Sequence, residues 1–107
     1  MKHYLTRAQM RELSEIGIDT LQLATHECTE NGITYFSLSI GDLIEMLPTC
    51  IDNEDYIIGS MLSILPVYKS DEWLIMYDYP IIAEGRASEL IDALHKMVVL
   101  LKKEGKI

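Results

Sequence analysis

The sequence lacks positive charge over more than half of its length: no lysine or arginine occurs between Arg11 and Lys69. The same stretch contains ten acidic residues, and the 107-residue chain has a formal net charge of −8. Proteins that bind nucleic acids carry a basic surface, which displaces the counterions of the phosphate backbone. The composition therefore argues against a nucleic-acid partner and predicts an acidic surface around the middle of the chain.

Closely spaced cysteines and long hydrophobic runs are also missing. Cys28 and Cys50 stand 22 positions apart, a spacing typical of reduced thiols rather than of a disulfide framework. The longest apolar stretch, residues 56–68, is interrupted by polar residues, glycine and proline, and is shorter than the ~20 residues of a membrane-spanning helix. The N-terminal residues contain no apolar signal core. We therefore expect a cytoplasmic protein without a membrane partner.

Motifs for catalysis and cofactor binding are absent as well. The sequence has neither a Gly-x-Ser-x-Gly nucleophile motif nor a glycine-rich phosphate loop. His26 and Cys28 form one closely spaced pair of potential zinc ligands, whereas structural zinc sites usually have two such pairs. The acidic residues at 52–55 lack the spacing of a calcium loop. We expect no enzyme activity, cofactor or metal, and the alternative of a small enzyme or metal protein requires His26 and Cys28 in one pocket.

Two helices are marked by their capping residues. Thr6 followed by Gln9 predicts a capping box at the start of a helix over residues 7–16. Ser39, with an acid three positions later, predicts the same start for a short helix over residues 40–47. Proline follows that second segment directly and cannot continue it.

Strands are predicted between and after these helices. Residues 19–31 are ambiguous, and we interpret them as a short extended piece followed by a loop. Asn-Gly at 31–32 favours a hairpin turn before the strand formers at 33–38. Residues 56–65 and 73–79 predict an antiparallel hairpin, and a loop is expected from there through Gly85.

The last helix has the clearest pattern, over residues 88–104. Its apolar residues cover about half of the helical wheel, which is wider than the ~100° stripe of a surface helix. We therefore expect it to be buried on more than one side. Val99 falls on the opposite face beside His95, so both side chains are expected to contact water. The order of elements predicts one α+β domain over residues 1–107, with a small antiparallel sheet and the N-terminal, short middle and long C-terminal helices packed on one face.

Three residues are candidates for contact with a partner. Trp73 and Tyr77 fall on one face of the second strand of the hairpin, and such aromatic residues recur at interface hot spots. The alternative is that they form the core beneath the helices. Val99 is either a stray exposed valine or a contact on the last helix. We name Trp73, Tyr77 and Val99 as the candidate interaction residues.

Residues 36–48 and 89–107, together with the opening 5–20, are similar to segments of small uncharacterised proteins of prophages and mobile elements in gut bacteria. The resemblance implies a compact accessory protein and assigns no activity and no site residue. Our leading hypothesis is a non-enzymatic protein-interaction module that binds a protein partner or associates with itself as a homo-oligomer. The alternative is an acidic decoy that mimics DNA and occupies a basic protein.

Overall fold

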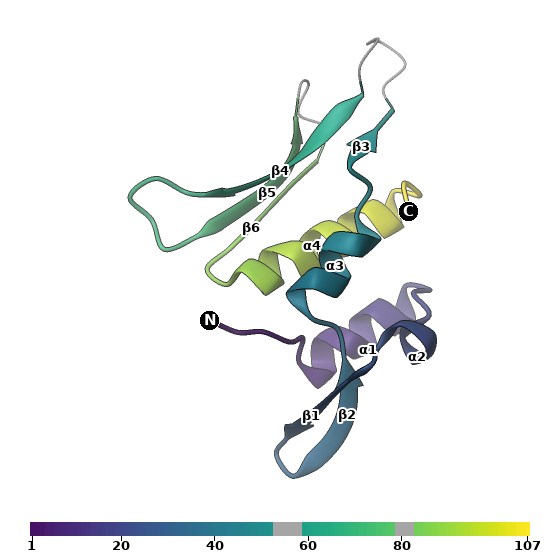
Figure 1. The fold of residues 1–107 in the computed structure, drawn as a ribbon. Helices are drawn as coiled ribbons and strands as arrows, with labels where there is room; N and C mark the ends of the chain where they lie inside the picture. The colour runs from purple at the N-terminus through teal and green to yellow at the C-terminus, as the bar shows by residue number, and fades with distance from the viewer. Residues whose placement is uncertain (53–58, 79–82) are drawn as a thin grey trace.

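Two antiparallel sheets and four helices form the α+β fold of the computed structural model, which describes residues 1–52, 59–78 and 83–107 (Figure 1). The predicted fold class is confirmed. The elements in chain order are α1 (Arg7–Glu15), α2 (Thr20–Leu23), β1 (His26–Glu30), β2 (Ile33–Ser37), α3 (Ile40–Met46), β3 (Cys50–Ile51), β4 (Ser60–Pro66), β5 (Trp73–Asp78), β6 (Ala83–Ala87) and α4 (Leu90–Lys103).

The larger sheet has the strand order β3-β4-β5-β6, and every neighbouring pair is antiparallel. The predicted hairpin of β4 and β5 is confirmed, with Ile64 opposite Ile75. The predicted loop through Gly85 is wrong, because residues 83–87 form the fourth strand. Its short sequence, Ala-Glu-Gly-Arg-Ala, contains no β-branched or aromatic residue and so gives no strand signal. The predicted strand positions 56–58 and 79 lie outside the described residues.

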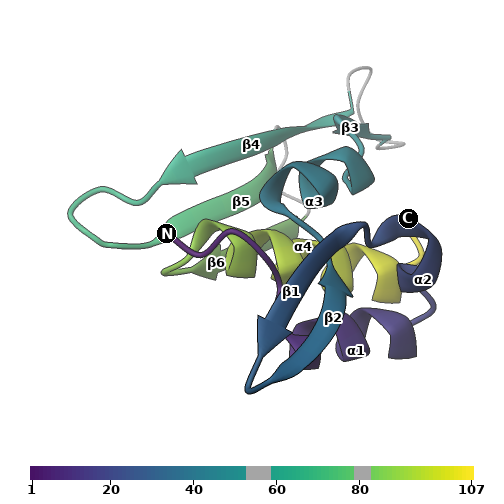
Figure 2. The same cartoon turned by 60° about the horizontal axis from the view of Figure 1, so that its bottom comes forward.

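The two faces of this sheet differ in what covers them. Ile75 and Tyr77 point to the core, and Leu62 and Ile64 pack beside them on the same face. Helices α3 and α4 cover that face (Figures 1 and 2). The alternating residues of β4 and β5 point the other way, where no described helix lies. We call this second side the outer face, and its apolar residues are Met61, Leu65, Leu74 and Met76.

Helix α4 lies in the middle of the fold and is buried on two sides, as its wide apolar arc predicts. One side packs so closely on β6 that a Cβ at Gly85 would lie 3.2 Å from the Ala93 carbonyl oxygen. The side that we expected to contact water is covered as well: His95 is 6% exposed and Val99 is 9% exposed. The predicted exposure of His95 and Val99 is therefore wrong, because helix α1 packs over a face that its sequence marks as polar.

A hydrogen-bonded network joins the N-terminal segment and α1 to α4. The Asp92 carboxylate accepts a bond from Gln9 Nε2 at 2.7 Å and from Lys2 Nζ at 2.7 Å. Burial works against ionisation of Asp92, but these donors prevail and hold its pKa below the ordinary value. The Lys2 backbone N–H also donates to Glu89 at 3.0 Å. The start of the chain is thereby fixed to the start of α4.

Both predicted capping boxes are present. The Thr6 hydroxyl accepts from the Gln9 N–H, and the Ser39 hydroxyl accepts from the Asp42 N–H, each at 3.2 Å. Each third helical residue returns a side-chain bond to the backbone of its cap. Glu30 of β1 adds a carboxylate at the α1 N-terminus, where it accepts from the Arg7 N–H at 3.2 Å and complements the helix dipole.

Residues 19–30 depart from the prediction of an extended piece and a loop. They form the one-turn helix α2, which Asp19 caps through the Gln22 N–H, and then strand β1. Strand β1 pairs with β2 through the predicted Asn31-Gly32 turn, in which both residues have positive φ. Only polar residues and Cys28 make up β1, so hydropathy could not reveal it. No helix in the described part of the chain is long and apolar enough to cross a membrane.

Candidate functional site

Two of the three predicted interaction residues lie in the core. Tyr77 is fully buried, and its hydroxyl donates to the Pro48 carbonyl at 2.6 Å. Burial raises the pKa of Tyr77 to about 12. Val99 is also buried, whereas Trp73 is only partly buried at the edge of the same cluster. The arrangement corresponds to the alternative we gave for Trp73 and Tyr77, the core beneath the helices, and it does not bring the three residues together on one surface.

The potential metal ligands do not form one site among the described residues. His26 Nε2 lies 3.2 Å from the Asp42 carboxylate, which also accepts the Ser39 N–H that closes the α3 capping box. Cys28 and Cys50 are both free thiols. Within residues 1–52, 59–78 and 83–107, no three side chains of the ligand-forming types gather into a cluster. The acidic pair Glu54 and Asp55 falls outside the described residues.

His95 is a buried polar group that sequence reasoning missed. Its Nε2 is the one buried side-chain polar atom of the described residues that has no hydrogen-bond partner. Desolvation lowers its pKa, and this effect outweighs the nearby carboxylates of Glu12 and Asp92, which act in the opposite direction. Two shallow surface hollows reach this histidine, but both are lined mainly by charged and polar residues of α1, α4 and β6.

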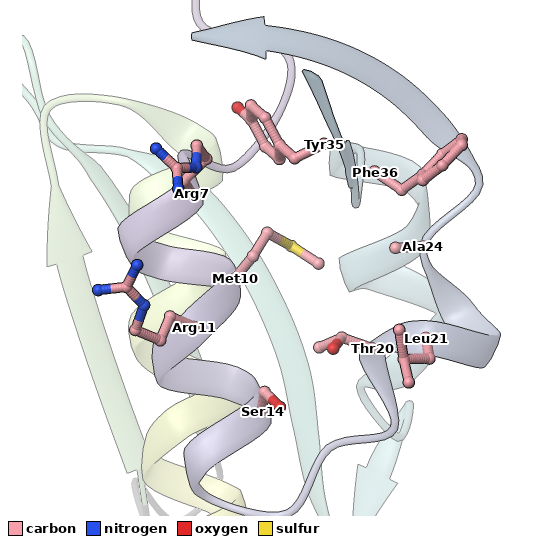
Figure 3. A pocket seen from close by; sticks show the side chains of 9 residues that line it. All are labelled: Arg7, Met10, Arg11, Ser14, Thr20, Leu21, Ala24, Tyr35 and Phe36. Atoms are coloured by element: carbon pink, nitrogen blue, oxygen red, sulfur yellow. The ribbon is translucent and has the colours of Figure 1, made fainter. Parts of the chain in front are cut away.

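A hollow of about 350 Å³ lies between α1, α2 and β2 (Figure 3). We call it the α1–α2 groove. Met10 projects from α1 across its floor, and Tyr35 and Ala24 form the opposite wall. The Tyr35 hydroxyl is engaged elsewhere, because it donates to the Leu5 carbonyl at 2.9 Å. The groove is lined by Arg7, Met10, Arg11, Ser14, Thr20, Leu21, Ala24, Tyr35 and Phe36.

Large apolar side chains next to this groove are exposed to solvent. Leu21 of α2 is 96% exposed and Phe36 of β2 is 59% exposed. Both line the groove, and Leu23 and Ile33 add exposed apolar surface on the same two elements. Single exposed apolar residues are ordinary, but a group of them beside a concavity is typical of an interaction site.

Positive charge borders the groove on its α1 side. The cations of residues 1–68 are Lys2, Arg7 and Arg11. Lys2 is paired with Asp92, whereas neither arginine guanidinium forms an ion pair with a carboxylate of the described residues. Both arginines line the groove, with their guanidinium groups turned away from its apolar floor (Figure 3). Residues 1–68 are mainly acidic, and their two unpaired cations, Arg7 and Arg11, both lie at the rim of the α1–α2 groove.

The outer face of the sheet is a second apolar surface. Met61 and Leu65 are each 46% exposed, and Met76 is buried between its neighbours without joining the main core. This face carries Asp78, Glu84 and Arg86 around its apolar residues. The α1–α2 groove combines exposed apolar side chains with a concave floor, and it is therefore our candidate site.

Neither a protein-family model, a curated protein nor a solved structure matches this chain.

Proposed function

We propose that the protein is a non-enzymatic interaction module that binds a short segment of a partner protein in the α1–α2 groove. The segment carries an apolar anchor beside one or more carboxylates. The observation that carries this proposal is the position of Arg7 and Arg11, which are unpaired cations at the rim of a groove with an apolar floor.

The shape of the groove favours an amphipathic segment. Met10 and Ala24 offer an apolar floor for an aliphatic or aromatic anchor, and the exposed Leu21 and Phe36 extend this surface beyond it. Its volume of about 350 Å³ is at the lower end of the range of protein pockets, roughly 300–1,000 Å³. One or two side chains of a partner would fill it. Recognition of an amphipathic helix in an apolar groove is a common mode of peptide binding.

The distribution of charge favours a partner segment that carries carboxylates. The protein has a net charge of −8, so its surface repels acidic partners at most positions. The rim formed by Arg7 and Arg11 is a local exception. Because both guanidinium groups are turned away from the floor, they would meet carboxylates at the flank of a bound segment. Complementary charge at the rim sets the orientation of the segment and the rate of binding.

Selection from a displayed library of random 12-residue peptides tests this proposal. The wild-type protein is expected to enrich peptides with an apolar anchor next to Asp or Glu. The double variant Arg7→Glu/Arg11→Glu is expected to bind those peptides at least about tenfold more weakly, because like charges replace the complementary pairs. Binding is measured by fluorescence anisotropy at fixed ionic strength.

The matched control is Lys69→Glu/Lys106→Glu, which makes the same change in net charge at two exposed positions that do not line the groove. It should retain wild-type affinity within about twofold, because surface charges separated by more than a Debye length of about 8–10 Å are screened. If no peptide class is enriched, or if both double variants weaken binding equally, the groove is not the binding site.

A further inference from the structure

Strand β6 forms an open edge of the larger sheet. Among the described strands it pairs only with β5, and its residues Glu84 and Arg86 are exposed. In an antiparallel ladder, alternate residues direct both backbone groups to the same neighbour. The Arg86 carbonyl accepts a bond from Lys96 Nζ at 2.8 Å and so points away from β5. The backbone groups of Glu84, two residues earlier, therefore point to the same open side.

The opposite edge of the sheet is covered in part. There, β3 already covers the start of β4, with Cys50 opposite Met61. Strand β4 ends at Pro66, which has no N–H to donate. Unpaired edges are usually blunted in this way, since an open edge is a template for another chain. Of the two edges, β6 is the more open, because neither another described strand nor a proline interrupts it.

We propose that two copies of this chain associate through β6, which pairs antiparallel with β6 of the second copy about a two-fold axis at Gly85. In this register Glu84 of each copy lies opposite Arg86 of the other. The backbone groups that point to the open side in each copy then bond to one another. The two four-stranded sheets become one continuous sheet of eight strands, and the interface is isologous, as in most homodimers.

The charges of Glu84 and Arg86 favour this register over those shifted by one residue. The Glu84 and Arg86 side chains both lie on the outer face, because their β5 partners Met76 and Leu74 do. A two-fold axis at Gly85 forms two complementary Glu–Arg pairs across the interface. Moving the axis to Glu84 would oppose two glutamates, and moving it to Arg86 would oppose two arginines. Opposite charges directly across a strand pair stabilise it, whereas like charges destabilise it.

The flank of α4 beside this edge is hollowed. A shallow hollow of about 480 Å³ lies between this flank and α1, and its lining is mainly polar, with Val99 and the partly buried Leu100 as its apolar members. The Lys96 ammonium is exposed, and the Arg86 carbonyl has a second lone pair for the N–H of the partner copy.

Complementary charge variants provide the test, with mass measured by light scattering during gel filtration at about 100 μM. The wild-type protein is expected to elute as a dimer of the 12.2 kDa chain. Glu84→Arg alone and Arg86→Glu alone each place like charges across both pairs. Each variant is expected to raise the dimer dissociation constant at least about tenfold. Mixing the two variants in equal amounts restores complementary pairs and is expected to restore the dimer as a heterodimer.

The mixture separates pairing from folding. Arg86→Glu also removes the intrachain ion pair with Glu72, whose atoms lie 2.9 Å apart, and that loss persists in the mixture. Recovery on mixing therefore requires a contact between copies. A monomeric wild-type protein at this concentration, or a mixture that stays monomeric, overturns the proposal. The variant Arg7→Glu/Arg11→Glu should remain dimeric, because neither arginine lies on β6. A result that disproves the dimer therefore leaves peptide binding in the α1–α2 groove untouched, and the reverse also holds.

Discussion

At the residue scale, His95 is a buried ionisable side chain whose Nε2 atom has no hydrogen-bond partner among the described residues. It lies on the face of α4 toward α1, and desolvation lowers its pKa below the ordinary value of 6.5. The folded protein therefore holds His95 neutral at a pH at which the unfolded chain binds a proton. Stability is expected to fall as the pH drops below about 6.5 toward the lowered pKa of the folded state, and His95 should contribute no pH dependence well above pH 7.

The variant His95→Gln removes this titration and keeps a polar side chain of similar length. Urea unfolding at pH 7.5 and 5.5 measures the effect. Wild type should lose more unfolding free energy than His95→Gln over this interval, with a contribution of at most about 1.4 kcal/mol per pH unit from one proton. The control is His3→Gln, at an exposed position, which should follow wild type. Equal pH dependence of wild type and His95→Gln would contradict the account.

The burial of His95 and Val99 could not be predicted from their own helix. On the wheel of α4 both residues share a face with Asp92, so the pattern indicates solvent. In the structure Asp92 is bonded to Lys2 and Gln9, which lets the N-terminal segment and α1 cover that polar face. Helical periodicity reports only apolar burial, and a face buried beneath a polar network gives no such signal.

At the element scale, β6 and α4 pack closely against each other. A Cβ at Gly85 would lie 3.2 Å from the Ala93 carbonyl oxygen and 3.5 Å from the Met97 backbone nitrogen. Because both are backbone atoms, a methyl group must push the helix and the strand apart. Gly85→Ala is expected to lower the free energy of unfolding by about 1–3 kcal/mol, measured by urea unfolding.

Gly41→Ala is the matched control. Gly41 lies in the first turn of α3, where an added Cβ would lie 3.8 Å from the Ser39 hydroxyl oxygen, an ordinary contact. Alanine in a helix is favoured over glycine by roughly 0.5–1 kcal/mol, so this variant should be neutral or stabilised. A Gly85→Ala protein as stable as wild type would show that β6 and α4 are not packed as described.

Helices and turns marked by capping or turn residues in their own sequence were predictable. Strands that form only through contact with neighbouring elements were not. Helices α1 and α3 were visible because Thr6 and Ser39 begin capping boxes, and the β1–β2 turn because of its Asn-Gly dipeptide. Strands β1 and β6 contain mainly charged and small residues. Each becomes a strand because a partner supplies the hydrogen bonds and a helix or core supplies the packing, and a single-segment pattern does not contain that information.

At the scale of the whole molecule, α4 joins two parts of the fold. The four-stranded sheet packs on one side of α4, and α1 covers another, with the β1–β2 hairpin beside α1 (Figures 1 and 2). The β6 edge belongs to the first part and the α1–α2 groove to the second. The two contacts that we propose, one to a second copy and one to an acidic segment of a partner, therefore use two separate surfaces.

The sequence predicted the character of this molecule better than the place of its site. Charge composition predicted an acidic protein, but the groove needs Met10, Ala24 and Phe36 from three parts of the chain, one of which, the α2 segment, was not predicted as a helix. The aromatic residues led us to predict Trp73 and Tyr77 as interaction residues, but Tyr77 is buried in the core. A site formed by the contact of α1, α2 and β2 exists only once their packing is known.

Chemical-shift mapping of the backbone amides, with a display-selected acidic peptide added to the ¹⁵N-labelled protein, would locate the surface that binds the partner segment. We expect shifts concentrated in residues 7–14, 20–24 and 35–36, which surround the α1–α2 groove, and their loss in the Arg7→Glu/Arg11→Glu variant. Shifts centred on Met61, Leu65 and Leu74 would place the binding surface on the outer face of the sheet and would contradict the account.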